Sequence, residues 1–171
     1  MRYKNMNKKN IKGISVIEIL IVAAFIAVGF TGILGVISYS LKISTSTKEI
    51  VQANNLAQEA IEAVRNFRDG TDWNTDGLKN YVPVIATSSA PYHLELNNNF
   101  SPPKWTLATG TESIDSFTRA IIFEKVSRDA EKNIEQIYNP VNDHSDTRKI
   151  IATISWKNKE VKLVTYLTNW K

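Results

Sequence analysis

An uncharged apolar segment close to the N-terminus is the feature that most constrains the fold. Residues 19–41 form a run of 23 residues without a charged side chain. A membrane-spanning helix needs about 20 apolar residues, whereas the apolar part of a secretory signal has about 7–15. No small-x-small cleavage motif follows the run, and residues 19–28 lack the polar stripe of a core helix. We therefore expect residues 14–44 to form a membrane-spanning helix.

The distribution of charge predicts the orientation of this helix. Residues 1–13 contain five basic side chains and no acidic one, whereas the remaining residues contain 16 basic and 17 acidic side chains. Positively charged flanks stay on the cytoplasmic side of a membrane, so we expect a cytoplasmic N-terminus and an extracytoplasmic head over residues 45–171. Since the basic excess is confined to the N-terminus, a protein that coats nucleic acid is disfavoured.

The composition also excludes several kinds of chemistry. The chain has no cysteine and two histidines, His93 and His144. Disulfides, thiolate metal sites and cysteine nucleophiles are thereby excluded, and two histidines are too few for most histidine-based catalytic sites. The sequence contains no nucleophile elbow, metal dyad or phosphate-binding loop. We interpret both histidines as solvated or structural, and we expect a protein that is not an enzyme and needs no cofactor.

A single carboxylate precedes the uncharged run. It belongs to Glu18, the last residue of the segment KGISVIE that covers residues 12–18. An acidic side chain within an apolar stretch is costly and usually marks a functional position. The alternative from the residues alone is an interfacial glutamate whose side chain reaches the lipid headgroups.

This segment resembles the prepilin signal of type IV pilins and of the pseudopilins of type II secretion. That signal is a short basic leader ending in glycine, a cut before the apolar run, and a glutamate at the fifth mature position; Lys12, Gly13 and Glu18 match it at the expected spacing. The first mature residue is most often Phe or Met, and here it is Ile14. The resemblance implies that residues 1–13 are a leader peptide and that cleavage occurs between Gly13 and Ile14. It also implies N-methylation of Ile14 and a role for Glu18 in subunit assembly.

Electrostatics provides a physical reason for a cut after Gly13 and a carboxylate at Glu18. Cleavage after Gly13 would remove all five basic side chains of the leader and create an α-amine on Ile14. An amine and a carboxylate are each costly in a low-dielectric helix bundle, and much less so as a pair. A helix cannot easily pair its own first and fifth residues, but a neighbouring helix shifted by about one turn can supply the amine to Glu18.

The helix is expected to continue beyond the apolar run. Residues 45–68 contain neither Gly nor Pro, and apolar residues recur there at spacings of three and four, which is typical of an amphipathic helix. Asp69 and Gly70 provide a stop signal. We therefore expect one long helix with an apolar half and an amphipathic half.

The rest of the head is expected to be mainly β-structure. Residues 69–113 are rich in Asn, Thr, Ser and Pro, and we interpret them as a variable connecting region with two short strands at 92–96 and 105–108. Residues 114–171 are expected to form a β-sheet, with strands at 117–126, 150–156 and 161–167. An antiparallel meander of these strands would cover the amphipathic half of the helix, which gives an α+β fold of the type IV pilin kind.

One loop is a weak candidate for a metal site. Asp72, Asn74 and Asp76 place oxygen side chains at positions one, three and five of a loop like that of an EF-hand, and Gly77 follows at position six. The twelfth position, where a bidentate glutamate belongs, is Pro83. We therefore favour an Asx-rich turn without a metal.

The C-terminal segment is basic. Residues 147–171 hold six basic side chains and one acidic side chain. Three interpretations are open: a solvated edge strand protected against aggregation, a contact with an acidic face of the next subunit, or a patch that attracts DNA or a cell surface.

Taken with the resemblance, these features predict a structural subunit, a minor pilin or pseudopilin, of a type IV pilus-like filament. The implied partners are a prepilin peptidase, an assembly platform in the inner membrane and other pilin or pseudopilin subunits. The precursor would lie in the inner membrane before it assembles into a filament outside it. The alternative is an uncleaved single-pass anchor that displays an extracytoplasmic binding domain, which explains the span but not the spacing of Gly13 and Glu18.

Overall fold

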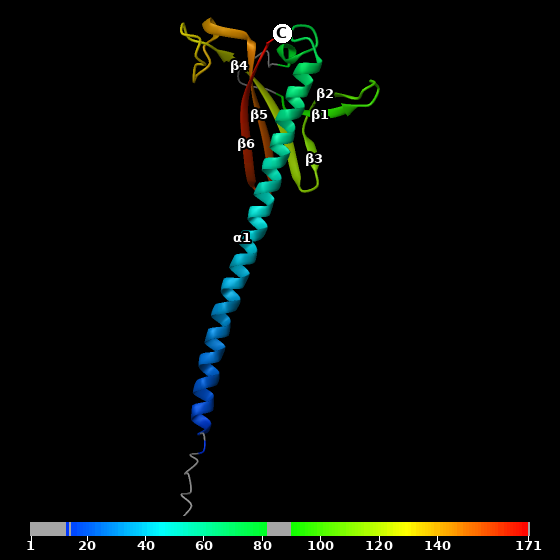
Figure 1. The fold of residues 1–171 in the computed structure, drawn as a ribbon. Coiled ribbons are helices and arrows are strands. Elements are labelled where there is room, and N and C mark those ends of the chain that lie inside the picture. The colour runs from blue at the N-terminus through cyan, green and yellow to red at the C-terminus, as the bar shows by residue number, and fades with distance from the viewer. Residues whose placement is uncertain (1–12, 14, 82–89, 171) are drawn as a thin grey trace, which may run out of the picture. The chain divides into compact units, whose positions relative to one another are not determined.

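The computed structural model describes residues 13, 15–81 and 90–170 (Figure 1). Most of the expected leader, the first mature residue Ile14 and position 83 of the candidate metal loop lie outside the described residues. The chain divides into two compact units, Met1–Thr47 and Lys48–Lys171, which we call the N-terminal unit and the head unit. Its elements are α1 (Val16–Gly70), η1 (Leu78–Asn80), β1 (Tyr92–Asn97), β2 (Lys104–Thr109), β3 (Glu112–Ile114), β4 (Phe117–Ser127), η2 (Pro140–Asn142), β5 (Asp143–Trp156) and β6 (Lys159–Thr168).

The long helix predicted from the sequence is confirmed. Helix α1 has 55 residues and begins after Ser15, whose carbonyl oxygen accepts the amides of Glu18 at 3.0 Å and Ile19 at 3.3 Å. At its other end, the Thr71 hydroxyl donates to the carbonyl oxygen of Phe67 at 2.7 Å and so satisfies one of the terminal carbonyl groups. The helix thus starts and stops two residues later than the expected 14–68.

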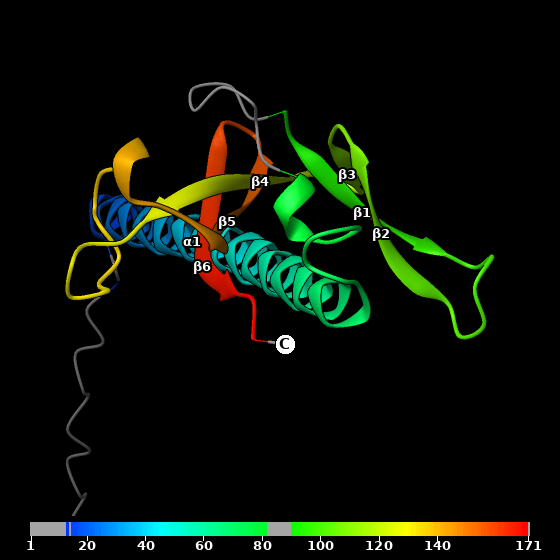
Figure 2. The same cartoon turned by 90° about the horizontal axis from the view of Figure 1, so that it is seen from above.

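Within the head unit, α1 packs through a stripe of small side chains. Ala53, Ala57 and Ala60 are all 0% exposed, and Val64 and Phe67 extend the same face. Alanines at spacings of four and three lie on one face of the helix together with Val64 and Phe67, and this face belongs to the same core as the buried side chains of the sheet. Figure 2 looks along this part of the helix and shows it lying against the strands.

The sheet has six strands in the order β2-β1-β4-β5-β6, with β3 paired to β4, and every pairing is antiparallel. Residues of β4 and β5 alternate between buried and half-buried, so one face of the sheet supplies the core. The buried residues of this face are Phe117, Ile121 and Phe123 of β4, Ile150, Ala152, Ile154 and Trp156 of β5, and Leu167 of β6. The α+β fold class predicted from the sequence is confirmed.

The sheet extends further than expected, because part of the predicted connecting region belongs to it. The two strands expected at 92–96 and 105–108 exist as β1 and β2, but they join the main sheet, and β3 adds a strand that was not predicted. Strand β5 also begins at Asp143 and not at residue 150. Its first seven residues are mostly polar, so their strand structure comes from pairing with β4 and β6, as in Thr147 opposite Thr168, and not from an apolar pattern.

Two polar contacts fix the helix on the sheet. The Arg119 guanidinium of β4, 3% exposed, donates to Glu112 Oε2 at 2.6 and 2.9 Å and to Glu59 Oε1 on α1 at 3.2 Å. The Glu49 carboxylate on α1 accepts the indole N–H of Trp156 at 3.0 Å and the ammonium of Lys157 at 2.7 Å. These two donors at the β5–β6 turn lower the pKa of Glu49, so the carboxylate stays charged in the folded head unit.

We expect the substitution Ala57→Leu to destabilise the head unit by about 1–3 kcal/mol, because a larger side chain separates the helix from the sheet. Gln58→Leu introduces the same side chain one position further on, where the residue is exposed. It should change stability by less than about 0.5 kcal/mol. Urea unfolding of both variants, followed by near-ultraviolet circular dichroism, measures the difference. Equal stabilities would contradict the role assigned to the alanine stripe.

Candidate functional site

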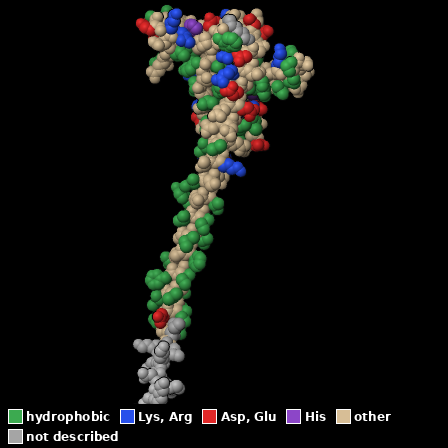
Figure 3. Space-filling model, in the orientation of Figure 1, with side chains coloured by type: hydrophobic (Ala, Val, Ile, Leu, Met, Phe, Trp, Pro, Cys, Tyr) green, Lys and Arg blue, Asp and Glu red, His purple; other side chains and the backbone are tan. Residues whose placement is uncertain are grey.

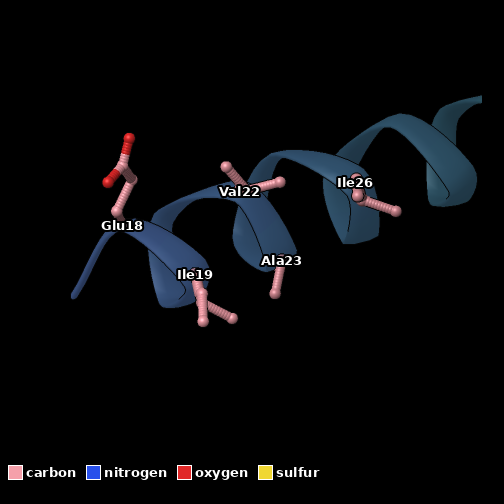
Figure 4. Close-up of a pocket in the computed structure, with 5 residues that line it drawn as sticks. All are labelled: Glu18, Ile19, Val22, Ala23 and Ile26. Carbon is pink, nitrogen blue, oxygen red and sulfur yellow. The ribbon is translucent and has the colours of Figure 1, made fainter. Parts of the chain in front are cut away.

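The N-terminal unit presents one acidic side chain at the start of an apolar helix. Glu18 lies in the first turn of α1, where unpaired backbone N–H groups and the helix dipole favour a negative charge. Figure 4 shows its carboxylate pointing away from the helix axis, with Ile19, Val22, Ala23 and Ile26 on neighbouring turns. None of the described residues donates a hydrogen bond to this carboxylate or forms an ion pair with it.

Glu18 and the four residues around it line a shallow, almost wholly apolar hollow on one face of the helix. The apolar surface extends along the rest of the unit: large hydrophobic residues between Val16 and Ile43 are 48–75% exposed. Figure 3 shows hydrophobic side chains along this stretch, with an acidic side chain near its start. An apolar surface of this extent is unfavourable in water and marks a region that contacts a membrane or another protein.

One helix among the described residues is long and apolar enough to span a membrane, and it is α1. Its most apolar 18-residue window has a mean hydropathy of 2.6 and is not buried inside the protein. This finding supports one part of the expectation: the N-terminal helix could anchor the chain in a membrane. The orientation of the helix remains a prediction from the charges of residues 1–13.

The expected cleavage position lies only partly within the described chain. Gly13 is exposed, and no described heavy atom lies within 4 Å of the position that a β-carbon on Gly13 would occupy. Ile14 lies outside the described residues, so the bond between them and its spatial relation to Glu18 stay predictions. The open space around Gly13 has one consequence: the described fold does not exclude a larger side chain there. Any requirement for glycine would come from a partner.

The candidate metal loop is an Asx turn, as the sequence favoured. Asp72 Oδ1 accepts the amides of Asn74 and Thr75, both at 3.0 Å, and the Thr75 hydroxyl at 3.2 Å. The amide oxygen of Asn74 accepts the ammonium of Lys79 at 2.9 Å. Two of the three proposed ligand side chains thus already hold the turn together, and the third, Asp76, donates its backbone amide to the Asp72 carbonyl.

The glycine of this loop has a packing role. A β-carbon on Gly77 would lie 2.6 Å from the carbonyl oxygen of Asp72 and 2.7 Å from the α-carbon of Trp73. Trp73 is 5% exposed, and its indole N–H donates to the carbonyl oxygen of Ser145 at 3.2 Å, which fixes the loop to the start of β5. The glycine of this loop is therefore explained by the close approach of the Gly77 backbone to that of Asp72 and Trp73.

The two histidines each contact one neighbouring side chain. His93 Nε2 lies 3.0 Å from Glu95 Oε1, and His144 Nδ1 lies 3.0 Å from the hydroxyl of Thr147. Within the described ranges, no three His, Asp or Glu side chains are grouped so that they could hold a metal ion. These positions fit the structural interpretation of both histidines.

One surface of the head unit was not predicted from the sequence. In the loop between β4 and β5, Ile137 is 83% exposed and Val141 is 90% exposed. Apolar residues in an aperiodic, polar segment give no signal of whether they will be buried, because burial there depends on the path of the loop. The pattern could only have indicated that these residues fall outside the regular strands.

We expect calcium to have no effect on the stability of the head unit, because the oxygens of Asp72 and Asn74 are engaged within the turn. The test compares the melting temperature of residues 48–171, whose core lies entirely within that range, in millimolar calcium and in a chelator. Asp76→Ala serves as the matched variant. A calcium-dependent rise in melting temperature that Asp76→Ala abolishes would show that the loop binds the metal.

Comparisons of the chain with protein-family models, with curated proteins and with solved structures found no match. What the fold itself shows is a long apolar N-terminal helix that continues onto an antiparallel sheet, an architecture compatible with that of a pilin.

Proposed function

We propose that this chain is a structural, non-enzymatic subunit, a minor pilin or pseudopilin, of a type IV pilus-like filament. A prepilin peptidase cuts it between Gly13 and Ile14, the new N-terminus is methylated, and an inner-membrane platform assembles it with other pilin or pseudopilin subunits. The observation that carries the proposal is Glu18: a carboxylate in the first turn of an exposed apolar helix, five residues after a glycine that ends a basic leader.

The state of the helix in the single chain supports an assembly role. Every described residue of α1 from Val16 to Thr45 is exposed, so this stretch buries nothing within its own chain. In a membrane, lipid covers it; in a filament, the helices of neighbouring subunits replace the lipid. The same surface thus serves both states, and the transfer between them needs no refolding of α1.

The Glu18 carboxylate can define the axial position of one helix relative to its neighbour, which apolar contacts alone do not. Apolar helices can slide along one another with little change in buried area, so their contact alone does not fix a register. A Glu18 carboxylate paired with the Ile14 amine of a neighbouring chain is much less costly in a low-dielectric bundle than either charge alone. This pairing selects one axial offset among many.

We expect Gly13→Val to block processing and to leave the full-length precursor in the membrane. The described fold leaves open space at Gly13, so failure of cleavage would reflect recognition by the peptidase and not misfolding. Mass spectrometry of the chain isolated from its own cells measures the outcome: the wild type should lack the first 13 residues. Lys9→Val, within the leader but away from the cut, is the control. Normal cleavage of Gly13→Val, or a wild type that keeps its leader, would instead favour the uncleaved anchor.

Glu18→Leu should insert into the membrane at least as well as the wild type, since an ionised side chain within a span is unfavourable, by about 2.5–3.5 kcal/mol at its centre and by less near its end, where Glu18 lies. It should nevertheless be depleted from filaments, because the neighbouring amine loses its partner. Glu18→Gln keeps the size of the side chain and removes its charge, and we expect the same depletion. Immunoblots of membrane and sheared-filament fractions measure both variants. Wild-type levels in the filament fraction would refute the pairing.

A further inference from the structure

A small polar pocket lies in the head unit on the face of the sheet that α1 does not cover. One side of it is a row of three side chains on neighbouring strands: Glu124 of β4 lies opposite Lys149 of β5, which lies opposite Tyr166 of β6. These positions alternate along their strands with buried residues of the core, so the pleat of the sheet directs them away from α1. The loop of residues 128–142 supplies the other side of the pocket.

Hydrogen bonds hold Glu135 of this loop in place at the pocket. Its amide donates to the carbonyl oxygen of Ser127 at 3.0 Å, and its Oε1 accepts the side-chain amide of Asn142 at 3.0 Å. The second carboxylate oxygen of Glu135, Oε2, is buried, and no described residue donates a hydrogen bond to it. A buried carboxylate oxygen without a donor is unfavourable. Glu135 therefore needs a donor that the described part of the chain does not supply.

The charges that line the pocket are only partly paired. The Lys149 ammonium lies 2.9 Å from Glu124 Oε2, so these two charges balance each other. The other two charged residues of the lining are Glu135 and Lys125, and among the described residues neither forms an ion pair. The pairing of β4 with β5 is irregular between Lys125 and Ser127, and irregularities of this kind redirect side chains. The pocket thus combines one unpaired acidic group with one unpaired basic group.

We infer that this pocket binds a small zwitterionic amino acid, with the ammonium group of the ligand at Glu135 and its carboxylate at Lys125. An ammonium group donates up to three hydrogen bonds, and a charged donor is the strongest partner for a buried carboxylate oxygen. The carboxylate of the ligand accepts from the ammonium of Lys125 in the same way. Each charge of the ligand then meets an opposite charge, which offsets the cost of removing both from water.

The size of the pocket and the groups around it narrow the choice of ligand. Its volume of about 90 Å³ has room for about three water molecules, so a ligand of the size of glycine or alanine fits and leucine does not. A metal ion needs several oxygen ligands, and within the described part of the chain no three His, Asp or Glu side chains are grouped to supply them. Water can donate to Glu135 Oε2, but it carries no charge to balance Glu135 or Lys125.

Ligand-observed NMR titrations of the full-length chain in detergent micelles test this site with glycine and alanine. We expect one binding site per chain. Methylammonium and acetate each carry only one of the two charges, so both should bind at least tenfold more weakly than glycine. Leucine should bind at least tenfold more weakly than alanine, because its side chain exceeds the volume of the pocket.

Two substitutions then remove the unpaired charges one at a time. Glu135→Gln and Lys125→Met should each weaken the binding of glycine at least tenfold, because one end of the ligand loses its charged partner. Glu131→Gln and Lys132→Met make the same replacements at exposed positions of the loop that do not line the pocket, and they should leave the affinity unchanged. Binding of glycine that survives both pocket substitutions would overturn the assignment of the site.

All residues of the pocket belong to the head unit, so binding does not depend on whether the chain enters a filament. If neither glycine nor alanine binds at up to about 10 mM, the site is refuted and the proposed function is untouched. Methylammonium that binds as tightly as glycine would also refute it, because Lys125 would then have no part in recognition. The comparison of ligands needs only the wild-type chain, so it decides the question even if a pocket variant does not fold.

Discussion

The fit of a small-residue helix stripe against the sheet is the constraint on which the head unit depends. Ala53, Ala57 and Ala60 are fully buried in the core that α1 shares with β4 and β5, and Val64 and Phe67 extend the same helix face. The Glu59–Arg119 and Glu49–Trp156 contacts add polar links between the helix and the sheet. Because these alanines are fully buried, a larger side chain at any of them would have to displace the atoms packed around it.

Much of this fold can be read from periodicity. The helix face at 53, 57, 60 and 64, the β-forming residues of 117–126 and the alternation at 161–167 gave boundaries close to those observed, because apolar side chains there face one continuous core. Prediction failed where pairing partners decide the structure. Strand β3 has only three residues, and the first half of β5 is polar; both are strands because β4 and β6 lie beside them. Arg119 was also missed, since a buried arginine is explained only by the two carboxylates around it.

Among the candidate sites, too, those defined by local sequence could be predicted and those that depend on tertiary structure could not. The spacing from Gly13 to Glu18 is a linear motif, and its interpretation needs no tertiary structure, although Ile14 lies outside the described residues and the cut itself remains a prediction. The loop at Asp72 was correctly interpreted as a turn because Asx side chains bond to amides two and three residues ahead. The exposed Ile137 and Val141 could not be identified beforehand, because no local rule fixes which side of an irregular loop faces solvent.

The contacts of α1 in the head unit have a mechanical consequence. Glu49 is bonded at the end of β5 through Trp156, and Trp73, just after the helix, is bonded at the start of β5 through Ser145. The helix therefore lies antiparallel to this strand along most of its length. Tension that pulls α1 towards its N-terminus would load the alanine stripe, the Arg119 bridge and both tryptophan contacts in shear, so that they resist together and not one after another. A head mounted in this way is suited to transmit a pulling force without unfolding.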